Sequence, residues 1–214
     1  MTARRAPKPW DEAYRHQGRL WRGARLDGPT LELLEAWPAL AAGRWFDAGC
    51  GDGKGLAPLA QRVARVDAAD ASRWALRRAR EVTAVPLLQA DARAWPLRDQ
   101  AYDAVRAVHL LGHLDPEGQS VAATEVRRLL RPQGVAVVCD FGRGDFRHGT
   151  GEAIGPHTFR RGVGVVTHYF DIDSYRTLLS EAGLEIIRIE TERFDVRYAG
   201  SDLPRERVWA WARA

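Results

Sequence analysis

The sequence predicts an α/β protein built on a mostly parallel, doubly wound sheet with helices on both faces. Short apolar segments alternate with helix-like segments between residues 44 and 140. A glycine-rich turn, FDAGCGDGKG over 46–55, joins the first of these strands to a helix. The 214 residues, 45% of them hydrophobic, suffice for one packed α/β unit. Alternation of this kind is typical of parallel strands joined by crossover helices.

The predicted elements follow from the same patterns, in chain order. Two helices, over 10–20 and 30–40, precede the sheet. Strands are expected over 44–48, 65–70, 86–90, 102–108 and 134–140, and the alternating helices over 54–63, 72–82 and 118–130. Pro132 and Gly134 provide the turn before the fifth strand. A helix over 173–182 and strands over 184–190 and 207–212 complete the sheet, and residues 163–170 have the composition of a further strand.

The glycine-rich turn indicates a ligand site. Asp47 precedes Gly49, Gly51 and Gly53, and glycine is needed where a side chain would collide with a ligand or where φ is positive. The N–H groups at the start of the following helix point toward such a ligand. Asp70 ends the next apolar segment, near the interval of about 20 residues at which dinucleotide-binding folds place a ribose-binding carboxylate. The pattern therefore predicts a nucleoside-containing cofactor.

The spacing of the glycines excludes two phosphate-binding motifs. A G-x-G-x-x-G fingerprint would need glycine where Lys54 or Leu56 stands. A Walker-type loop fails because Gly49 and Lys54 do not have its spacing and no Ser or Thr follows the lysine. The remaining pattern, D-x-G-x-G-x-G, resembles motif I of the class I S-adenosylmethionine-dependent methyltransferases, including those of the type 11 and type 12 groups, whose cofactor has no phosphate.

The resemblance extends from about Arg44 to Phe141 and implies roles for further residues. The implied cofactor contacts are Asp47, Gly49, Cys50, Gly51, Gly53, Asp70, Ala71, Asp91, Ala92, Val108 and His109. Asp70 would accept hydrogen bonds from both ribose hydroxyls, although Asp67 is a competing carboxylate inside the same strand. Asp91 would accept from the adenine amino group, and the Ala92 N–H would donate to the ring. The implied fold is Rossmann-like, with strand order 3-2-1-4-5-7-6 and strand 7 antiparallel.

The chain is expected to form a single methyltransferase domain over 1–214. Its expected parts are an N-terminal helical lid over 1–42, a cofactor-binding core over 43–141, a substrate-capping insertion over 142–170 and the C-terminal part of the sheet over 171–214. Residues 9–23, PWDEAYRHQGRLWRG, resemble the opening of small-molecule methyltransferases of the tellurite-resistance and thiopurine type. The resemblance implies that Trp10, Tyr14 and Trp21 line the lid; a surface helix anchored by aromatic residues is the alternative.

The glycine-rich segment 142–170 is the second candidate for substrate contacts. A stretch of this kind in a compact domain is usually functional or mobile. A capping loop or hairpin is expected, with His168 and Tyr169 as candidate substrate residues, and a disordered loop is the alternative.

His109 is the candidate catalytic residue. It ends the fourth predicted strand, and the resemblance places this position beside the reactive methyl group. An imidazole with a pKa near 6.5 could deprotonate a nucleophile. The alternative is a backbone contact to the cofactor, with no role for the ring. His109 and His113 have i, i+4 spacing but lack the H-E-x-x-H glutamate, so no metal site is predicted.

The charge of the chain bears on its partners. The formal net charge is +4, and Arg73, Arg77 and Arg80 share a face of one predicted helix. Such a face can contact nucleic acid, but a solvated surface is the preferred interpretation, because no appended RNA-binding module and no NPPY-like element is visible. A nucleic-acid partner is therefore not favoured.

The expected function is transfer of a methyl group from S-adenosylmethionine to a small-molecule acceptor by in-line displacement, which releases S-adenosylhomocysteine. A methyltransferase acting on RNA or protein is the first alternative, and a regulatory protein that binds the cofactor without turnover is the second. No apolar run of about 18 residues and no secretory signal is apparent, so a cytoplasmic location without a membrane partner is expected. The pattern does not predict an oligomeric state.

Overall fold

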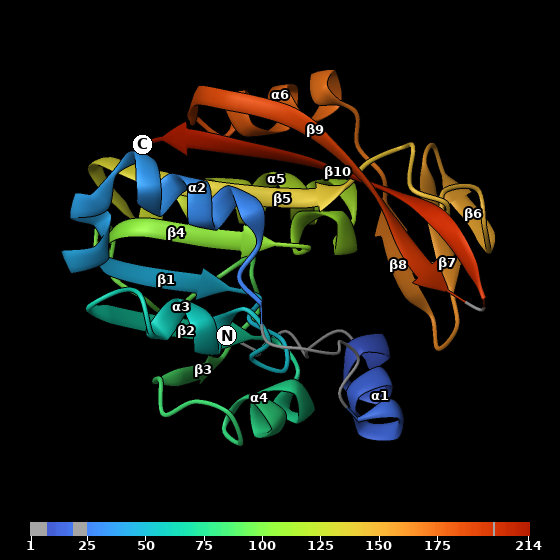
Figure 1. Cartoon of the computed structure of the whole chain (residues 1–214), viewed down its shortest axis with the longest axis horizontal. Helices are drawn as coiled ribbons and strands as arrows, with labels where there is room; N and C mark the ends of the chain where they lie inside the picture. Colours follow the sequence, from blue (N-terminus) through green and yellow to red (C-terminus); the bar gives the residue numbers. More distant parts are fainter. Residues whose placement is uncertain (1–7, 19–24, 199) are drawn as a thin grey trace.

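The computed structural model describes residues 8–18, 25–198 and 200–214. Its main sheet has seven strands in the order β3-β2-β1-β4-β5-β10-β9 (Figure 1). These strands are β1 (Arg44–Ala48), β2 (Arg65–Asp70), β3 (Leu87–Gln89), β4 (Tyr102–Val108), β5 (Leu130–Phe141), β9 (Glu185–Tyr198) and β10 (Ser201–Arg213). Strands β1 to β5 are parallel, and β10 runs antiparallel to both β5 and β9. The predicted strand order and its antiparallel insertion are confirmed.

Helices cover both faces of the main sheet. They are α2 (Gly28–Ala36), α3 (Leu56–Ala60), α4 (Arg73–Ala79), α5 (Pro116–Leu129) and α6 (Ile172–Glu181), with the 3-10 helix η1 (Pro38–Ala42). Helix α1 (Lys8–Gln17) and the 3-10 helix η2 (Leu111–His113) instead lie at the carboxyl ends of the strands, where α1 contacts α4 (Figure 1). One apolar cluster joins α2, α3 and α4 to the sheet, and a second joins α5 and α6 to the other side. Side chains of Asp27, Ser72, Asp115 and Asp171 cap four of the helices by accepting from backbone N–H groups.

The last two strands are much longer than predicted. The sequence predicts strands over 184–190 and 207–212, whereas β9 and β10 have 14 and 13 residues and pair along almost their whole length. Much of this hairpin extends beyond the body of the sheet (Figure 1). Charged residues are therefore tolerated there, and they interrupt the apolar pattern from which strands are predicted. Several helices are instead shorter than predicted; α3, for example, has only five residues.

The segment between β5 and α6 forms a small sheet of its own. Strands β6 (Glu152–Gly155), β7 (Thr158–Arg161) and β8 (Val165–His168) pair antiparallel in that order. The connection from β5 is attached to β10, because Gly142 N–H donates to the Glu206 carbonyl and Phe146 N–H to the Pro204 carbonyl, each over 2.9 Å. Residues 142–170 are thus an ordered insertion beside the hairpin. None of the described helices combines the length and apolar character needed to cross a membrane.

Candidate functional site

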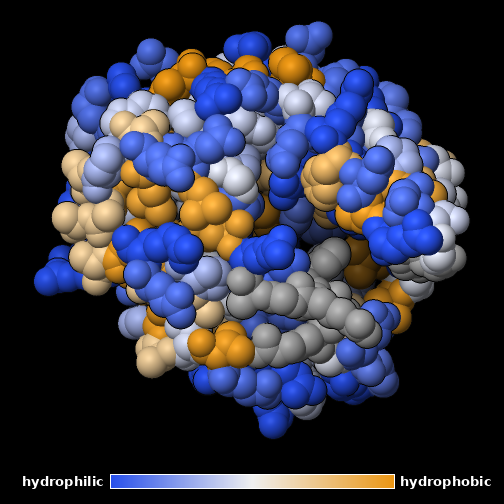
Figure 2. Space-filling model, in the orientation of Figure 1, coloured by the Kyte–Doolittle hydropathy of each residue, from blue (hydrophilic) through white to orange (hydrophobic). Residues whose placement is uncertain are grey.

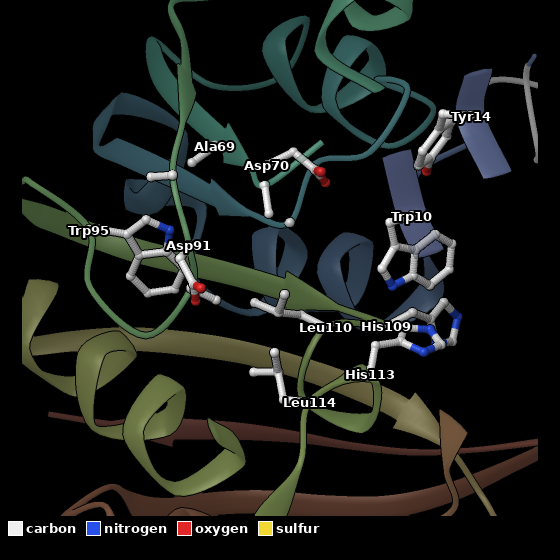
Figure 3. A pocket seen from close by; sticks show the side chains of 14 residues that line it. Trp10, Tyr14, Ala69, Asp70, Asp91, Trp95, His109, Leu110, His113 and Leu114 are labelled. Atoms are coloured by element: carbon white, nitrogen blue, oxygen red, sulfur yellow. The ribbon is translucent and has the colours of Figure 1, made fainter. Parts of the chain in front are cut away.

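A narrow crevice lies at the carboxyl ends of β1, β2 and β4, where an open α/β sheet of this order binds ligands. Side chains from α1, the ends of these strands and the segment after β3 surround it (Figure 3). The lining residues are Trp10, Tyr14, Gly49, Ala69, Asp70, Ala71, Ala90, Asp91, Ala92, Trp95, His109, Leu110, His113 and Leu114. The crevice therefore brings together six of the predicted cofactor residues from four separate segments.

The glycine turn adopts backbone conformations that favour glycine. The φ angles of Gly49, Gly51 and Gly53 are +72°, +55° and +83°. A Cβ on Gly49 would lie 2.9 Å from Leu110 Cδ1, and one on Gly51 would lie 2.7 Å from the Tyr14 hydroxyl. Gly53 lines neither cavity of the site: its Cβ would lie 3.1 Å from Ala79 Cα. Close packing against α4 therefore accounts for glycine at position 53, and the contact of Gly53 with the cofactor stays a prediction.

Asp70 is held in place by two backbone groups. Gly51 N–H donates to its Oδ2 over 2.9 Å and Ser72 N–H to its Oδ1 over 2.8 Å. Each oxygen keeps a further acceptor site, as a ribose diol requires. Burial raises the pKa of Asp70 to about 6, although the two backbone donors oppose this shift. The competing carboxylate, Asp67, lies outside the crevice, since its Oδ2 accepts from Arg44 Nη2 over 2.6 Å and from the Tyr102 hydroxyl over 3.0 Å.

The other end of the crevice combines an acid with apolar walls. Asp91 accepts from Arg93 Nε over 2.8 Å and from Arg93 Nη2 over 2.5 Å, a pairing that the sequence pattern did not predict. Trp95 packs edge-on against Phe46, with ring centroids 5.1 Å apart. Trp95 and Asp91 lie on one side of the crevice and Leu114 below them in Figure 3. This end suits a flat, largely apolar ring with a polar edge.

A wider cleft of about 470 Å³ adjoins the crevice and shares Trp10, Gly49, His109 and His113 with it. The remaining lining residues are Arg25, Leu26, Asp27, Gly28, Cys50, Gly51, Asp52, Lys54, Gly55, Arg106, Val108, Phe194, Val196, Arg205 and Arg207. Cys50, Gly51 and Val108 were predicted as cofactor contacts and line this cleft. The face shown in Figure 2 is hollowed between the body of the molecule and the lobe at its right, and hydrophilic residues border the hollow.

Asp47 lies just outside both cavities, in a buried ion network. Its Oδ1 accepts from Arg106 Nη1 over 2.6 Å, and Arg106 Nε donates to Asp27 Oδ2 over 2.9 Å. Burial raises the pKa of Asp47, whereas the nearby Arg106 charge lowers it. The second oxygen of Asp47 is buried and has no hydrogen-bond partner within the described ranges. A buried carboxylate oxygen in this position can accept a hydrogen bond from a ligand ammonium group.

His109 stands where crevice and cleft meet. Its backbone N–H donates to the Cys139 carbonyl over 2.6 Å, and its φ is +56°. Its imidazole ring stacks on the Phe141 ring, with centroids 4.0 Å apart. Burial, together with the charge of Arg207, lowers the pKa of His109 well below its usual range. The imidazole is therefore neutral at physiological pH and weakly basic. Its Nδ1 is buried and finds no partner among the described residues.

His113 is a site residue that the sequence analysis did not select. Its Nδ1–H donates to the Val166 carbonyl over 2.7 Å, and its ring meets Trp10 edge-on at 4.7 Å. Burial lowers the pKa of His113 to about 4, so this ring is also neutral. His109 follows β4 and His113 lies in η2, so the two do not share a helix. Across residues 8–18, 25–198 and 200–214, no group of three His, Cys, Asp or Glu side chains is placed to hold a metal.

Only part of the predicted substrate set reaches the site. Trp10 and Tyr14 line it, whereas Trp21 lies outside the described residues. His168 and Tyr169 line neither cavity, which corrects their expected placement. The ring of His168 is turned toward Thr158 Oγ1, 2.8 Å from its Nδ1, and the Tyr169 side chain is packed within the insertion.

Comparisons with known proteins agree with the geometry. Residues 46–134 match the model of a family described as a methyltransferase domain. The solved structure of Burkholderia thailandensis 1,6-didemethyltoxoflavin-N1-methyltransferase, which contains S-adenosylhomocysteine, superposes with a TM-score of 0.69 at 18% identity, covering 94% of this chain and 84% of that one. Together the fold, the crevice and the family match identify a class I S-adenosylmethionine-dependent methyltransferase domain in the chain, and the cofactor of such a domain is S-adenosylmethionine.

Curated relatives give a finer comparison. The chain is 30% identical over 118 residues to tRNA N(3)-cytidine methyltransferase METTL2 of Danio rerio, covering 54% of this chain and 33% of that protein. It is 27% identical over 209 residues to tRNA N(3)-methylcytidine methyltransferase Mettl2 of Drosophila melanogaster, covering 88% of this chain and 64% of that protein. The chain thus spans about one third of the first relative and somewhat under two thirds of the second.

Proposed function

We propose that the chain transfers the methyl group of S-adenosylmethionine to a nucleobase in RNA. The observation that carries this proposal is the lining of the cleft, which begins at Gly49 and His109 and presents Lys54, Arg205 and Arg207 together with the aromatic wall of Phe194. Cationic and aromatic side chains in one groove are typical of nucleotide-binding sites, since they match phosphates and bases. Similarity to the tRNA N(3)-cytidine methyltransferases supports the same acceptor class, in place of the small molecule that the sequence analysis favoured.

The crevice has the chemistry to hold the adenosyl group. Asp70 would accept hydrogen bonds from the ribose, and Trp95 and Leu110 would enclose the adenine beside Asp91. Glycine at positions 49 and 51 lets Leu110 and Tyr14 approach the turn closely, because side chains there would collide with them, and both residues would then border the bound cofactor. The free Asp47 oxygen would then lie near the ammonium end of the cofactor.

The residues around His109 fit a reaction that needs alignment rather than proton removal. When bound, S-adenosylmethionine would supply a sulfonium-activated methyl group: an acceptor nitrogen lone pair would bond to the methyl carbon as the carbon–sulfur bond breaks, and S-adenosylhomocysteine would leave with the bonding electrons. A pyridine-like ring nitrogen, such as N3 of cytosine, carries no proton at neutral pH, so no general base is required. The role of His109, whose ring is held by stacking on the buried Phe141, would be to fix the acceptor ring in line with the methyl group. A neutral His109 can do this through its buried, unpaired Nδ1.

Transfer of radiolabelled methyl groups tests the proposal. Purified protein would be incubated with labelled S-adenosylmethionine and, separately, with total tRNA and with a pool of small metabolites. We expect label in the RNA, and nucleoside digestion should recover it in methylated cytidine. Label that appears only in the metabolite pool would contradict an RNA acceptor. Absence of label from both pools, for a protein that binds the cofactor, would support the regulatory alternative instead.

A free nucleotide is a second candidate acceptor. The cleft, at about 470 Å³, has the size of a site for one small ligand. The same assay with cytidine monophosphate in place of tRNA separates the two, because a free-nucleotide enzyme would label the mononucleotide more efficiently than the polymer.

A further inference from the structure

The cleft contains more positive charge than its own acids balance. Five cationic side chains line it, Arg25, Lys54, Arg106, Arg205 and Arg207, but only two carboxylates, Asp27 and Asp52. Arg106 is already neutralised by Asp27 and Asp47. With Arg106 and Asp27 paired, four cationic residues of the lining remain, Arg25, Lys54, Arg205 and Arg207. Asp52 is the one other carboxylate that the structure places in that lining.

The partners of these cations leave most of their hydrogen-bond donors free. Arg205 Nε donates to Asp145 Oδ2 over 2.6 Å, but Arg147 shares the same carboxylate. Arg207 Nη2 donates to Glu192 Oε2 over 2.6 Å, while its buried Nε finds no acceptor in the described part of the chain. A guanidinium has five N–H donors in a fixed fork, so several remain for a ligand.

Lys54 has no direct ionic partner among the described residues of the cleft. It follows Gly53 in the glycine turn, is partly buried, and forms no salt bridge or hydrogen bond with any residue that the structure describes. Burial lowers its pKa, and the charges of Arg207, Arg205 and Arg25 lower it further against the opposing effect of Asp52. Like charges gathered in a cleft with low-dielectric walls attract anions strongly.

The positions of these groups indicate what the anion belongs to. Arg205 is paired in register with Phe194, which lines the same cleft, and the Arg207 guanidinium lies 4.8 Å from the Phe194 ring centroid. The charges of Arg207 and Arg205 also act on His109, at the junction with the crevice. An anion bound here would lie on the acceptor side of the reacting methyl group, with an aromatic surface beside it.

We propose that Lys54, Arg205 and Arg207 form a phosphate-binding subsite for the methyl acceptor. This inference rests on the proposed nucleotide acceptor and specifies which part of it the protein grips. The phosphate belongs either to an RNA backbone or to a free nucleotide. A different anion, the carboxylate of the cofactor's methionine, is the competing occupant of these cations.

Calorimetry with the cofactor product present tests the subsite. Cytidine 5′-monophosphate and cytidine would be titrated separately into protein saturated with S-adenosylhomocysteine. The wild-type protein should bind the monophosphate at least about tenfold more tightly, as expected for hydrogen bonds to a charged group. Lys54→Gln should bring the two affinities within about twofold of each other. Arg176→Gln, which removes an exposed charge on α6 outside the cleft, should leave the wild-type ratio unchanged.

The outcomes separate the competing occupants. An unchanged ratio in Lys54→Gln, or wild-type protein that does not discriminate, overturns the subsite. Lys54→Gln could instead lose affinity for S-adenosylhomocysteine while the ratio of its affinities for cytidine monophosphate and cytidine stays unchanged. That result would assign the cations to the cofactor and would also overturn the phosphate subsite. If Lys54→Gln fails to fold, displacement of cytidine monophosphate from the wild-type protein by inorganic phosphate supports the subsite, and lack of displacement refutes it.

The source of the phosphate is resolved with a dinucleoside monophosphate such as ApC, which has a backbone phosphate on the 5′ side of its cytidine but no terminal phosphate. Tight, Lys54-dependent binding of ApC supports an RNA strand, and the same result for the mononucleotide alone supports a free nucleotide. The test is also distinct from that of the proposed function. Lys54-dependent phosphate binding without RNA labelling refutes only the RNA acceptor, whereas RNA labelling that Lys54→Gln leaves intact refutes only the subsite.

Discussion

Arg106 Nη1 lies 2.6 Å from Asp47 Oδ1, so the middle of β4 is bound to the residue that begins the glycine turn. Arg106 also contacts Asp27, whose other carboxylate oxygen accepts from Thr30 N–H at the start of α2. A single guanidinium thus joins three segments that surround the cleft. The side chain of Arg106 is only 8% exposed and that of Asp47 is fully buried, so neither charge can rely on water for compensation.

Replacing Arg106 should therefore destabilise the fold. Arg106→Met leaves two buried carboxylates without their cation, and breaking a buried pair in this way typically costs about 3–5 kcal/mol. Urea unfolding at neutral pH measures the change. Arg160→Gln, which breaks a salt bridge between largely exposed partners, is the matched control and should cost less than about 1 kcal/mol. Equal losses in the two variants would show that the buried network is not what holds the segments together.

Cofactor affinity should depend on the ionisation of Asp70. Its pKa is raised to about 6 by burial, and ribose hydroxyls bind the ionised form better because it only accepts hydrogen bonds. S-adenosylhomocysteine should therefore bind more tightly as the pH rises through about 6. Asp70→Asn should weaken binding by more than about 1.5 kcal/mol and remove this pH dependence. Asp67→Asn, in the same strand, should keep both the affinity and the pH profile of the wild type.

His109 should not behave as a general base. Since its pKa lies well below the usual range, the turnover number at saturating substrates should show no inflection near 6.5. His109→Leu should lower the turnover number by less than about a hundredfold, because a general base typically contributes 10²–10⁴-fold. The measurement is a pH–rate profile of both proteins with cofactor and acceptor in excess. An acid limb that disappears in the variant would restore His109 to the role that the sequence suggested.

Asp140 should make the protein less stable as the pH rises. It accepts hydrogen bonds from Gly112 N–H over 3.1 Å and from the Tyr175 hydroxyl over 3.1 Å, and burial raises its pKa to about 7. Between the unfolded value near 3.9 and about 7, the folded state binds the additional proton, so the free energy of unfolding falls through that window with rising pH.

Unfolding of wild-type protein and Asp140→Asn at about pH 5 and about pH 8 isolates this contribution. Relative to wild type, the free energy of unfolding of Asp140→Asn should be about 2–3 kcal/mol higher at about pH 8 than at about pH 5. Asp99→Asn, at a carboxylate that is 72% exposed, should show no comparable shift. Parallel pH dependence in wild type and Asp140→Asn would mean that Asp140 is ionised throughout.

The cofactor side of the site was predictable because its signals are local. Gly49, Gly51 and Asp70 lie at strand ends that the apolar pattern identifies, and parallel strands bring such ends to one edge of the sheet. Gly53 shows the limit of this reasoning. The motif correctly indicates a glycine at this position. The structural reason for it is the close approach of Ala79 in α4, which leaves little room for a side chain at position 53.

The cleft proposed to bind the methyl acceptor was not predictable, because its residues meet only through long-range packing. Lys54 and Arg207 are 153 residues apart in the sequence (207 − 54), and no periodicity relates them. Arg106 did carry a signal, since a charged residue inside the apolar strand YDAVRAV requires a buried partner, but nothing in the sequence identified Asp27 as that partner. Phe194 and Val196 alternate with charged residues, the pattern of a strand with one covered face, and this was missed because the charges dominate the segment.

Glu206 attaches the insertion to the hairpin, since it accepts from Gly144 N–H over 2.7 Å and from Arg193 Nε over 2.6 Å. The insertion and the hairpin therefore form one structural unit, and a substitution at Glu206 would disturb both of them together. A homologue could not replace the insertion without also adjusting the strand that anchors it.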